Sequence, residues 1–431
     1  IGTINLTDMP VSFFMTAALA AFYTGAASGN RRWYIAFYAA MASAALTKGL
    51  IGIILPGGIA FWYIVLTRRW RIMRDALYPP GILIFFAVSV PWFYLVCKAN
   101  PDFFRFFFIQ EHFLRYMTKM HDRYEPFWFY LPMIPAGMVP WTGFFFSLSG
   151  RGSVLRSPGS DENRGANIFL LLWFGIILTF FSLSGSKLIP YIVPCVPPLA
   201  ILIAANMSRM MDENRWIGGA LAWNSGISLA VSAALLAFAA INEYTGNFKA
   251  TPAMFPAAAA LSGGAILVLV VWRRTRDVKR SAAAMCAGAV IFVLGLQTLY
   301  ILVAERKSVF EVSSAVSAKK LPGETIAVYG EILQSVPFYA KERVMLVNSM
   351  GELKYGAEDE NERDRAHWFP DGAGFLRRWR GGEPLALIIR KEYVKELFGD
   401  EAVSELKNKN ATEAGGYVII FNRESAMDDE D

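Results

Sequence analysis

The stretch Arg31–Arg69, RRWYIAFYAAMASAALTKGLIGIILPGGIAFWYIVLTRR, decides the fold of this chain. Its interior is one apolar run, Trp33–Leu66, which is interrupted only at Thr47-Lys48-Gly49. A spanning helix needs roughly 20 apolar residues, so this run is too long to cross a bilayer once and about right to cross it twice. Arginines close both ends, and the positive-inside rule places such ends on the cytoplasmic face. The run is therefore predicted to form a helical hairpin with Lys48 on the far, extracytoplasmic side.

The same alternation of apolar runs and basic clusters repeats along the chain, and it predicts about ten spans within residues 1–304. The last span follows the basic cluster at 273–280, so everything after it is expected outside the cytoplasm. The predicted spans are Val11–Ala27, the two halves of Trp33–Leu66, Pro79–Cys97, Phe127–Leu148, Asn167–Leu183, Leu188–Ala205, Trp216–Ala240, Phe255–Trp272 and Ser281–Val303.

Composition agrees with a multi-pass membrane protein, which we expect to lie in the plasma (inner) membrane. Of the 431 residues, 55% are hydrophobic and only 18% are charged, which is unlike a soluble globular chain. The three cysteines all fall within apolar runs and predict neither a disulfide framework nor a metal cluster. The sequence begins at Ile1 without an initiator methionine, so we expect the true N-terminus to be missing.

Residues 305–431 differ sharply from the rest, because they are charged and contain no spanning run. Short β-rich segments alternate there with a helical pattern at Glu392–Lys407. These features predict a small extracytoplasmic α/β domain. The predicted strands are Thr325–Tyr329, Val344–Val347, Leu385–Ile389 and Tyr417–Phe421.

Most of the polar chemistry is concentrated in the stretch Lys98–Pro126, KANPDFFRFFFIQEHFLRYMTKMHDRYEP, which holds two of the three histidines. As a helix beginning near Asp102, it places Arg105, His112, Arg115 and Lys119 near one face, as in an amphipathic helix at a membrane interface. An aromatic-rich loop that anchors two membrane helices is the alternative.

Other polar residues are expected on the same outer face, namely Asp8, Lys48, and Lys187 with Tyr191. Lysine, arginine and histidine that converge on one face suit a phosphate group. Simpler explanations stay open for each position. Asp8 fits a helix N-cap, Lys48 can extend its ammonium to the interface, His112 has no metal partner adjacent in sequence, and the prolines near Tyr191 can merely kink a helix.

Five short motifs, taken in their order along the chain, resemble those of bacterial glycosyltransferases that use lipid-linked sugars. The resemblance is greatest to the aminoarabinose transferase type that modifies lipid A, a relative of the protein mannosyltransferases, and it covers nearly the whole chain. The motifs are Leu6-Thr7-Asp8-Met9-Pro10, Thr47-Lys48-Gly49-Leu50, Phe108–Tyr116 (FIQEHFLRY), Pro126–Tyr130 (PFWFY) with Pro140-Trp141, and Ser186–Pro194 (SKLIPYIVP).

The resemblance implies a GT-C fold with further spans ahead of Asp8, and with an acidic catalytic residue in that missing part. It places Asp8 beside the active site as a catalytic candidate and implies a divalent metal bound in the loop of Glu111 and His112. It also implies a polyprenyl-phosphate pocket lined by Lys48, Arg115 and Tyr191, to which Lys187 is a candidate addition.

The predicted function is inverting sugar transfer from a polyprenyl-phosphate donor to a lipid A-like acceptor at the outer face of the membrane. The expected partners are that donor, a lipid or protein acceptor and membrane lipids, with no nucleic acid. No nucleotide cofactor is expected, because the sequence contains neither a P-loop nor a strand-anchored glycine fingerprint. A protein mannosyltransferase or oligosaccharide ligase is one alternative, and a flippase or transporter of lipid-linked sugars is another.

Overall fold

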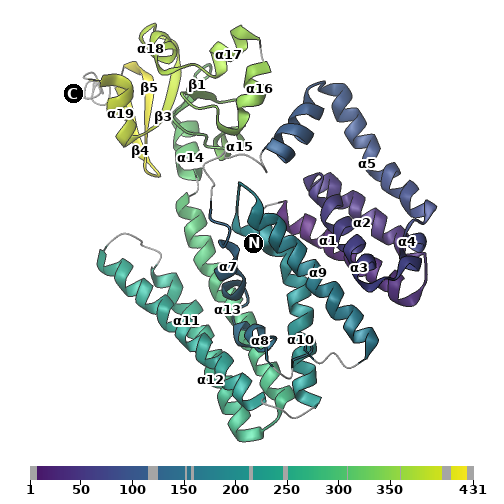
Figure 1. Ribbon diagram of the computed structural model, residues 1–431. Helices are drawn as coiled ribbons and strands as arrows, with labels where there is room; N and C mark the ends of the chain where they lie inside the picture. Colours follow the sequence, from purple (N-terminus) through teal and green to yellow (C-terminus); the bar gives the residue numbers. More distant parts are fainter. Residues whose placement is uncertain are drawn as a thin grey trace. The chain divides into compact units, whose positions relative to one another are not determined.

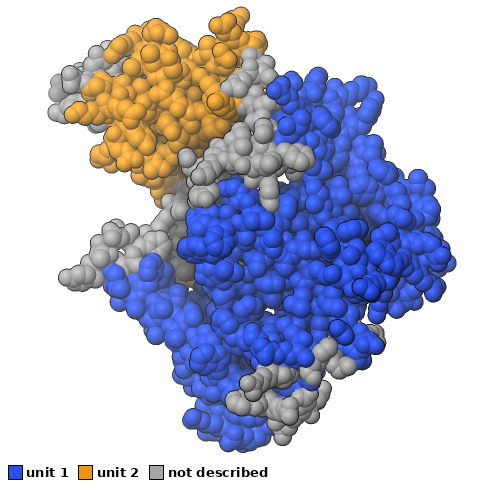
Figure 2. Space-filling view, viewed as in Figure 1, with its two compact units in different colours: residues 1–296 blue, residues 297–431 orange. Residues whose placement is uncertain are grey.

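The computed structural model describes residues 7–114, 125–150, 153–156, 160–212, 217–245, 251–307, 309–359, 361–399 and 409–424. The chain divides into two compact units, Ile1–Leu296 and Gln297–Asp431, which are coloured separately in Figure 2. The boundary between them falls inside the helix α13 (Val278–Lys307), which also contains the predicted division after residue 304.

The first unit is built of helices, which Figure 1 labels. In the described part of the chain, seven of its helical segments are long and apolar enough to cross a membrane, which confirms a polytopic α-helical fold. The elements are α1 (Asp8–Ser28), α2 (Trp33–Lys48), α3 (Ile51–Thr67), α4 (Trp70–Ala76), α5 (Pro79–Ala99), the π-helix η1 (Arg105–Leu114), α7 (Tyr130–Gly137), α8 (Thr142–Ser147), α9 (Asp161–Leu183), the 3-10 helix η2 (Ile189–Cys195), α10 (Val196–Asp212), α11 (Ile217–Thr245), α12 (Thr251–Thr275) and α13.

The hairpin predicted from Arg31–Arg69 is present as α2 and α3. The turn begins at Gly49, whose φ of 73° lies in the region that favours glycine. Beyond the turn, a Cβ atom on Gly52 would lie 2.5 Å from the backbone of Ala44, so the two helices meet in close contact there. With 16 and 17 residues, α2 and α3 are shorter than the other spans, which is one reason why fewer than ten helices reach full spanning length.

The predicted span Phe127–Leu148 is wrong as one continuous helix. It consists of the short helices α7 and α8, separated by a stretch that contains Pro140. Proline cannot donate the backbone hydrogen bond that a helix needs, and its ring clashes with the preceding turn. Hydropathy alone did not register this break.

The amphipathic α-helix predicted from Asp102 is also wrong in geometry, since Arg105–Leu114 forms a π-helix. A π-helix bonds residue i to i+5 and holds more residues in each turn, so the face deduced from an α-helical period does not apply. Aromatic side chains hold this segment against α5: the Phe93 ring centroid lies 5.9 Å from that of Phe107 and 5.5 Å from that of Phe108.

An aromatic cluster at the centre of the first unit joins α1, α3 and α9. The ring centroid of Phe169 lies 6.0 Å from that of Phe22, 5.0 Å from that of Tyr23 and 5.4 Å from that of Tyr63. Phe22 and Tyr63 are almost completely buried. Offset and edge-to-face contacts of this kind add to the burial of apolar area, so the cluster holds α1, α3 and α9 together.

The second unit contains one five-stranded sheet in the order β2-β1-β3-β5-β4. The strands β2, β1 and β3 are parallel, whereas β5 is antiparallel to both β3 and β4. The bounds are β1 (Thr325–Tyr329), β2 (Met345–Val347), β3 (Leu385–Arg390), β4 (Lys409–Ala414) and β5 (Tyr417–Glu424). Four strands agree with the prediction, while β4 was not predicted, because its sequence KNATEA lacks the β-branched, apolar pattern of a strand.

Helices cover both faces of this sheet, so the predicted α/β class is confirmed. On one face, Ala327 and Tyr329 of β1 pack in a cluster with Phe375 and Trp379. On the other, Ile326 and Val328 pack with α14 and α15. The helices are α14 (Phe310–Lys319), α15 (Ser335–Ala340), the 3-10 helix η3 (Gly351–Leu353), α16 (Lys354–Asp359), α17 (Glu362–Trp368), α18 (Gly372–Arg380) and α19 (Lys391–Phe398).

Candidate functional site

The site is centred on an ion pair between Asp8 and Lys48. Asp8 is the first residue of α1 and only 7% exposed, and Lys48 is the last residue of α2. The Lys48 ammonium donates a hydrogen bond to the Asp8 carboxylate. Thr7, rather than Asp8, holds the N-cap position. The hairpin turn thus brings Lys48 to the start of a different helix.

Tyr191 completes this cluster from the 3-10 helix η2. The Lys48 Nζ lies 4.5 Å from the centroid of the Tyr191 ring, which is within the range of a cation–π contact. The Tyr191 ring also lies 5.4 Å from that of Phe181 on α9. Three residues that sequence reasoning selected are therefore neighbours in space, although they come from three separate elements.

Two buried side chains fix the position of η2. The Tyr130 hydroxyl of α7 donates to the carbonyl oxygen of Leu188 over 3.0 Å. The indole N–H of Trp173 on α9 donates to the carbonyl oxygen of Pro194 over 3.0 Å. Sequence reasoning assigned neither residue this role. Tyr130 ends a motif that supported the family resemblance, but Trp173 stands in an ordinary apolar run without any signal.

Lys187 is bound to the backbone. Its ammonium donates to the carbonyl oxygens of Glu125 (2.8 Å) and Ser184 (2.7 Å), and the residue is only 5% exposed. Burial lowers the pKa of Lys187, and the nearby Glu125 carboxylate partly opposes that effect. These contacts tie the segment that enters α7 to the connection between α9 and η2, and the proposed role in phosphate binding stays a prediction.

The remaining site predictions fall in or beside the Lys98–Pro126 stretch. Arg115 lies outside the described residues. Glu111 and His112 lie in η1, but their side chains are not described. Within the described ranges, no group of three or more histidine, cysteine, aspartate or glutamate side chains forms a metal site. The metal prediction therefore stays untested.

Fold and site together define a class: a polytopic helical membrane protein with a polar cluster at the ends of its helices and a small α/β unit that follows the last span in the sequence.

Residues 312–406 match the family model of the aminoarabinose transferase C-terminal domain. The chain is 34% identical, over 49% of its length, to undecaprenyl phosphate-alpha-4-amino-4-deoxy-L-arabinose arabinosyl transferase 1 of Proteus mirabilis, and it covers 38% of that relative. It is 27% identical to the corresponding transferase of Aeromonas hydrophila, over 91% of the chain and 72% of the relative. The chain thus spans well under half of the first relative and about three quarters of the second.

The structure is similar to the crystal structure of ArnT from Cupriavidus metallidurans bound to undecaprenyl phosphate. The TM-score is 0.76 at 27% identity, covering 97% of this chain and 75% of the other. The apo structure of the same protein gives a TM-score of 0.73. These comparisons show that the chain is similar to the aminoarabinose transferases and has a GT-C fold like that of ArnT, and they confirm the resemblance found in its motifs.

Proposed function

We propose that the protein to which this chain belongs transfers a sugar from a polyprenyl-phosphate donor to a lipid acceptor. The observation that carries the proposal is the Asp8–Lys48–Tyr191 cluster, which lies in a fold whose solved relative binds undecaprenyl phosphate. The names of the relatives specify an arabinosyl transferase, which supports a pentose donor over a hexose donor.

The chemistry follows from the charges in the cluster. An acceptor oxygen attacks the anomeric carbon, the bond to the phosphate oxygen breaks, and negative charge grows on the lipid phosphate that leaves. Because this charge is larger in the transition state than in the ground state, the Lys48 ammonium stabilises the transition state more strongly and lowers the activation barrier. Asp8 holds the ammonium in place, and the face of Tyr191 supports it on another side.

The finer assignments extend the same proposal. Arg115 and Lys187 add cationic groups around the lipid phosphate, and Glu111 with His112 holds a divalent metal that adds further positive charge. The acceptor is a lipid A-like molecule, reached from the extracytoplasmic face of the inner membrane. Support comes from the motif order and from the aminoarabinose transferase relatives.

The test is transfer of label from polyprenyl-phosphate sugars, with the complete protein in proteoliposomes. We expect label to move from an aminoarabinose donor to a lipid fraction, and the Lys48→Ala variant to lose about a hundredfold in rate. Lys98→Ala is the matched control, because Lys98 is an exposed lysine at the end of α5. Its rate should stay at the wild-type level.

Two other outcomes would contradict the proposal. Label that appears on protein would favour the mannosyltransferase alternative. Label that crosses the bilayer without leaving its carrier lipid would instead show a flippase.

A further inference from the structure

A pocket of about 490 Å³ opens on the second unit between α17 and α18. Its volume falls in the range of small-molecule sites. The charged and aromatic side chains that line it are Glu362, Arg365, Phe369, Asp371, Arg377 and Arg378. Nothing in the proposed transfer mechanism uses this pocket.

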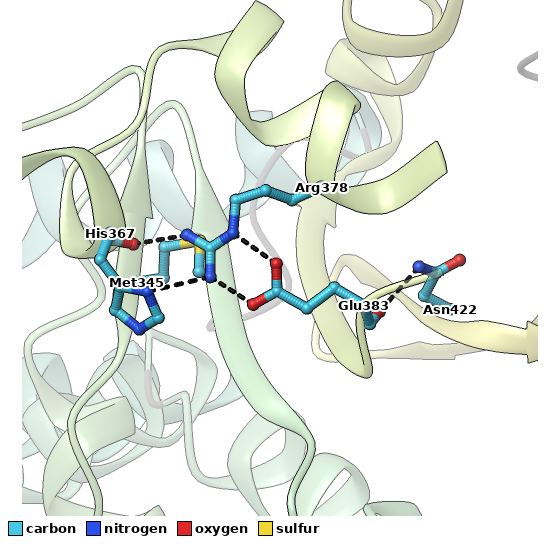
Figure 3. A network of polar contacts seen from close by, with 5 residues as sticks. All are labelled: Met345, His367, Arg378, Glu383 and Asn422. Atoms are coloured by element: carbon cyan, nitrogen blue, oxygen red, sulfur yellow. Dashed lines mark hydrogen bonds and ion pairs between the residues drawn. The ribbon is translucent and has the colours of Figure 1, made fainter. Parts of the chain in front are cut away.

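Arg378 lines the pocket and is held by a network of polar contacts, which Figure 3 shows. Its guanidinium makes a bidentate contact with Glu383, in which the Nε···Oε2 distance is 2.5 Å. The Nη1 group also donates to the carbonyl oxygen of His367 over 2.7 Å. Asn422 then fixes Glu383 by donating to its carbonyl oxygen over 2.8 Å. These contacts hold the Arg378 guanidinium in place at the side of the pocket.

Arg365 and Arg377 differ from Arg378. Both are exposed, and neither guanidinium has a hydrogen bond or ion pair within the described part of the chain. Two like charges that line one pocket repel each other, and an anion between them relieves that repulsion. Guanidinium groups bind phosphate oxygens through pairs of parallel hydrogen bonds. The two side chains therefore provide groups in the lining of the pocket that suit a phosphate.

The rest of the lining favours a ligand larger than phosphate alone. Glu362 and Asp371 place carboxylates on the same pocket, although Asp371 already accepts a hydrogen bond from the Gly374 N–H at 2.6 Å. Carboxylate oxygens are acceptors for hydroxyl groups. The partly buried Phe369 adds an apolar surface on which a sugar ring can lie.

We propose that this pocket binds a phosphate-bearing sugar, with Arg365 and Arg377 on the phosphate and Glu362 on the sugar hydroxyls. The inference concerns the second unit alone and does not rest on the proposed transfer. Ligand binding to this pocket is measured directly, so a lack of binding would leave the proposed sugar transfer untouched. A lack of sugar transfer would likewise leave this binding site untouched.

The experiment is a calorimetric titration of the full chain in detergent with glucose 1-phosphate, inorganic phosphate and glucose. We expect saturable binding of glucose 1-phosphate and weaker binding of the other two. Arg365→Gln and Arg377→Gln should each weaken the binding of glucose 1-phosphate about tenfold, the loss expected for one charged hydrogen-bonding group. Glu362→Gln should lower the ratio of the affinity for glucose 1-phosphate to the affinity for inorganic phosphate.

Arg363→Gln is the matched control, because Arg363 is an exposed arginine on the same helix but does not line the pocket. It should bind glucose 1-phosphate as the wild type does. If Arg363→Gln lost as much affinity for glucose 1-phosphate, the effect would come from general surface charge, and the proposed site would be overturned. No saturable binding by the wild type would also overturn it, and equal affinity for inorganic phosphate would overturn the assignment of a sugar.

A competition arm identifies the source of the ligand. Displacement of glucose 1-phosphate by micelles of a phosphorylated glycolipid supports the site with a lipid-borne headgroup. The absence of displacement supports it with a soluble sugar phosphate.

Discussion

At the scale of single residues, Lys48 connects structure and proposed chemistry. Its ammonium pairs with Asp8 and lies over the Tyr191 ring, so it holds together elements that are far apart in sequence. A charge in such a position is costly when its partner is removed, because the remaining charge is left without compensation. The pair can therefore be tested for stability and for transfer separately.

We expect Asp8→Asn and Lys48→Met each to destabilise the protein by roughly 3 kcal/mol, the lower end of the range for breaking a buried pair, since Lys48 is partly exposed. The double variant should recover much of that loss, because neither charge remains. Thermal unfolding in detergent measures this, while transfer should stay low in all three variants. Wild-type transfer in the double variant would show that the pair is only structural.

Glu383 gives a pH dependence at the same scale. The hydrogen bonds from Arg378 hold the pKa of this carboxyl below its usual value, against a smaller opposing effect of burial. A lowered folded-state pKa adds stability that is present above the unfolded-state pKa and is lost as the pH falls through the folded-state pKa.

Unfolding temperatures of wild type and Glu383→Gln, compared between about pH 6 and pH 3, check this effect, because that range brackets the ordinary titration of a glutamate. The unfolding temperature of the wild type should fall toward that of the variant as the pH drops below 4.5, the ordinary pKa of the carboxyl. Parallel curves across the range would contradict the assignment.

At the scale of elements, small residues let helices of the first unit approach closely. On α12, a Cβ atom added to Gly264 would lie 3.0 Å from the Cα atom of Gly288 on α13. The neighbouring Gly263 faces open space, with nothing within 4 Å of an added Cβ. Helices in membranes associate through such contacts, because lipid tails provide no hydrophobic drive for their association.

Gly264→Leu should therefore force α12 and α13 apart and destabilise the protein by about 1–3 kcal/mol, the usual cost of overpacking. Gly263→Leu adds the same side chain one position earlier and should be neutral or slightly stabilising, because leucine favours a helix more than glycine does. Thermal unfolding of the two variants in the same detergent compares them. Equal destabilisation would mean that the helix contact is unimportant.

At the scale of the whole molecule, the basic clusters predict which side of the membrane each part faces. The Arg31 Nε donates to the Asp75 Oδ1 over 2.8 Å, and Asp75 is only 8% exposed. This ion pair joins part of the α1–α2 connection to α4. The positive-inside rule predicts that these connections lie in the cytoplasm and that the second unit lies on the opposite side of the membrane.

Labelling with a membrane-impermeant thiol reagent checks the sidedness in intact cells. In a background in which Cys97, Cys195 and Cys286 are replaced by alanine, Lys395→Cys on α19 should be labelled from outside the cytoplasmic membrane. Arg32→Cys should react only after the cells are opened. Labelling of both sites in intact cells, or the reverse pattern, would overturn the predicted topology.

Local patterns were enough to predict much of the fold. The hairpin at Lys48 follows from the length of an apolar run and the charges at its ends, and β1 and β3 follow from short β-rich runs. Run length and hydrophobic periodicity predict such elements because both are set by residues that are close together in the sequence. The break near Pro140 and the π-helix at η1 depend on backbone geometry that hydropathy does not report.

The candidate site shows the limit of that reasoning. Sequence and resemblance selected Asp8, Lys48 and Tyr191, but only the packing of α1, α2 and η2 makes them neighbours. Lys187 was only a candidate addition to this site, and the fold brings its ammonium to two backbone carbonyls, contacts that the sequence does not predict. Composition and periodicity determine which segments are apolar enough to cross a membrane, because hydropathy is a property of each segment by itself. Which charged groups meet is decided by the tertiary structure, because each ion pair joins atoms that only the folded chain brings together.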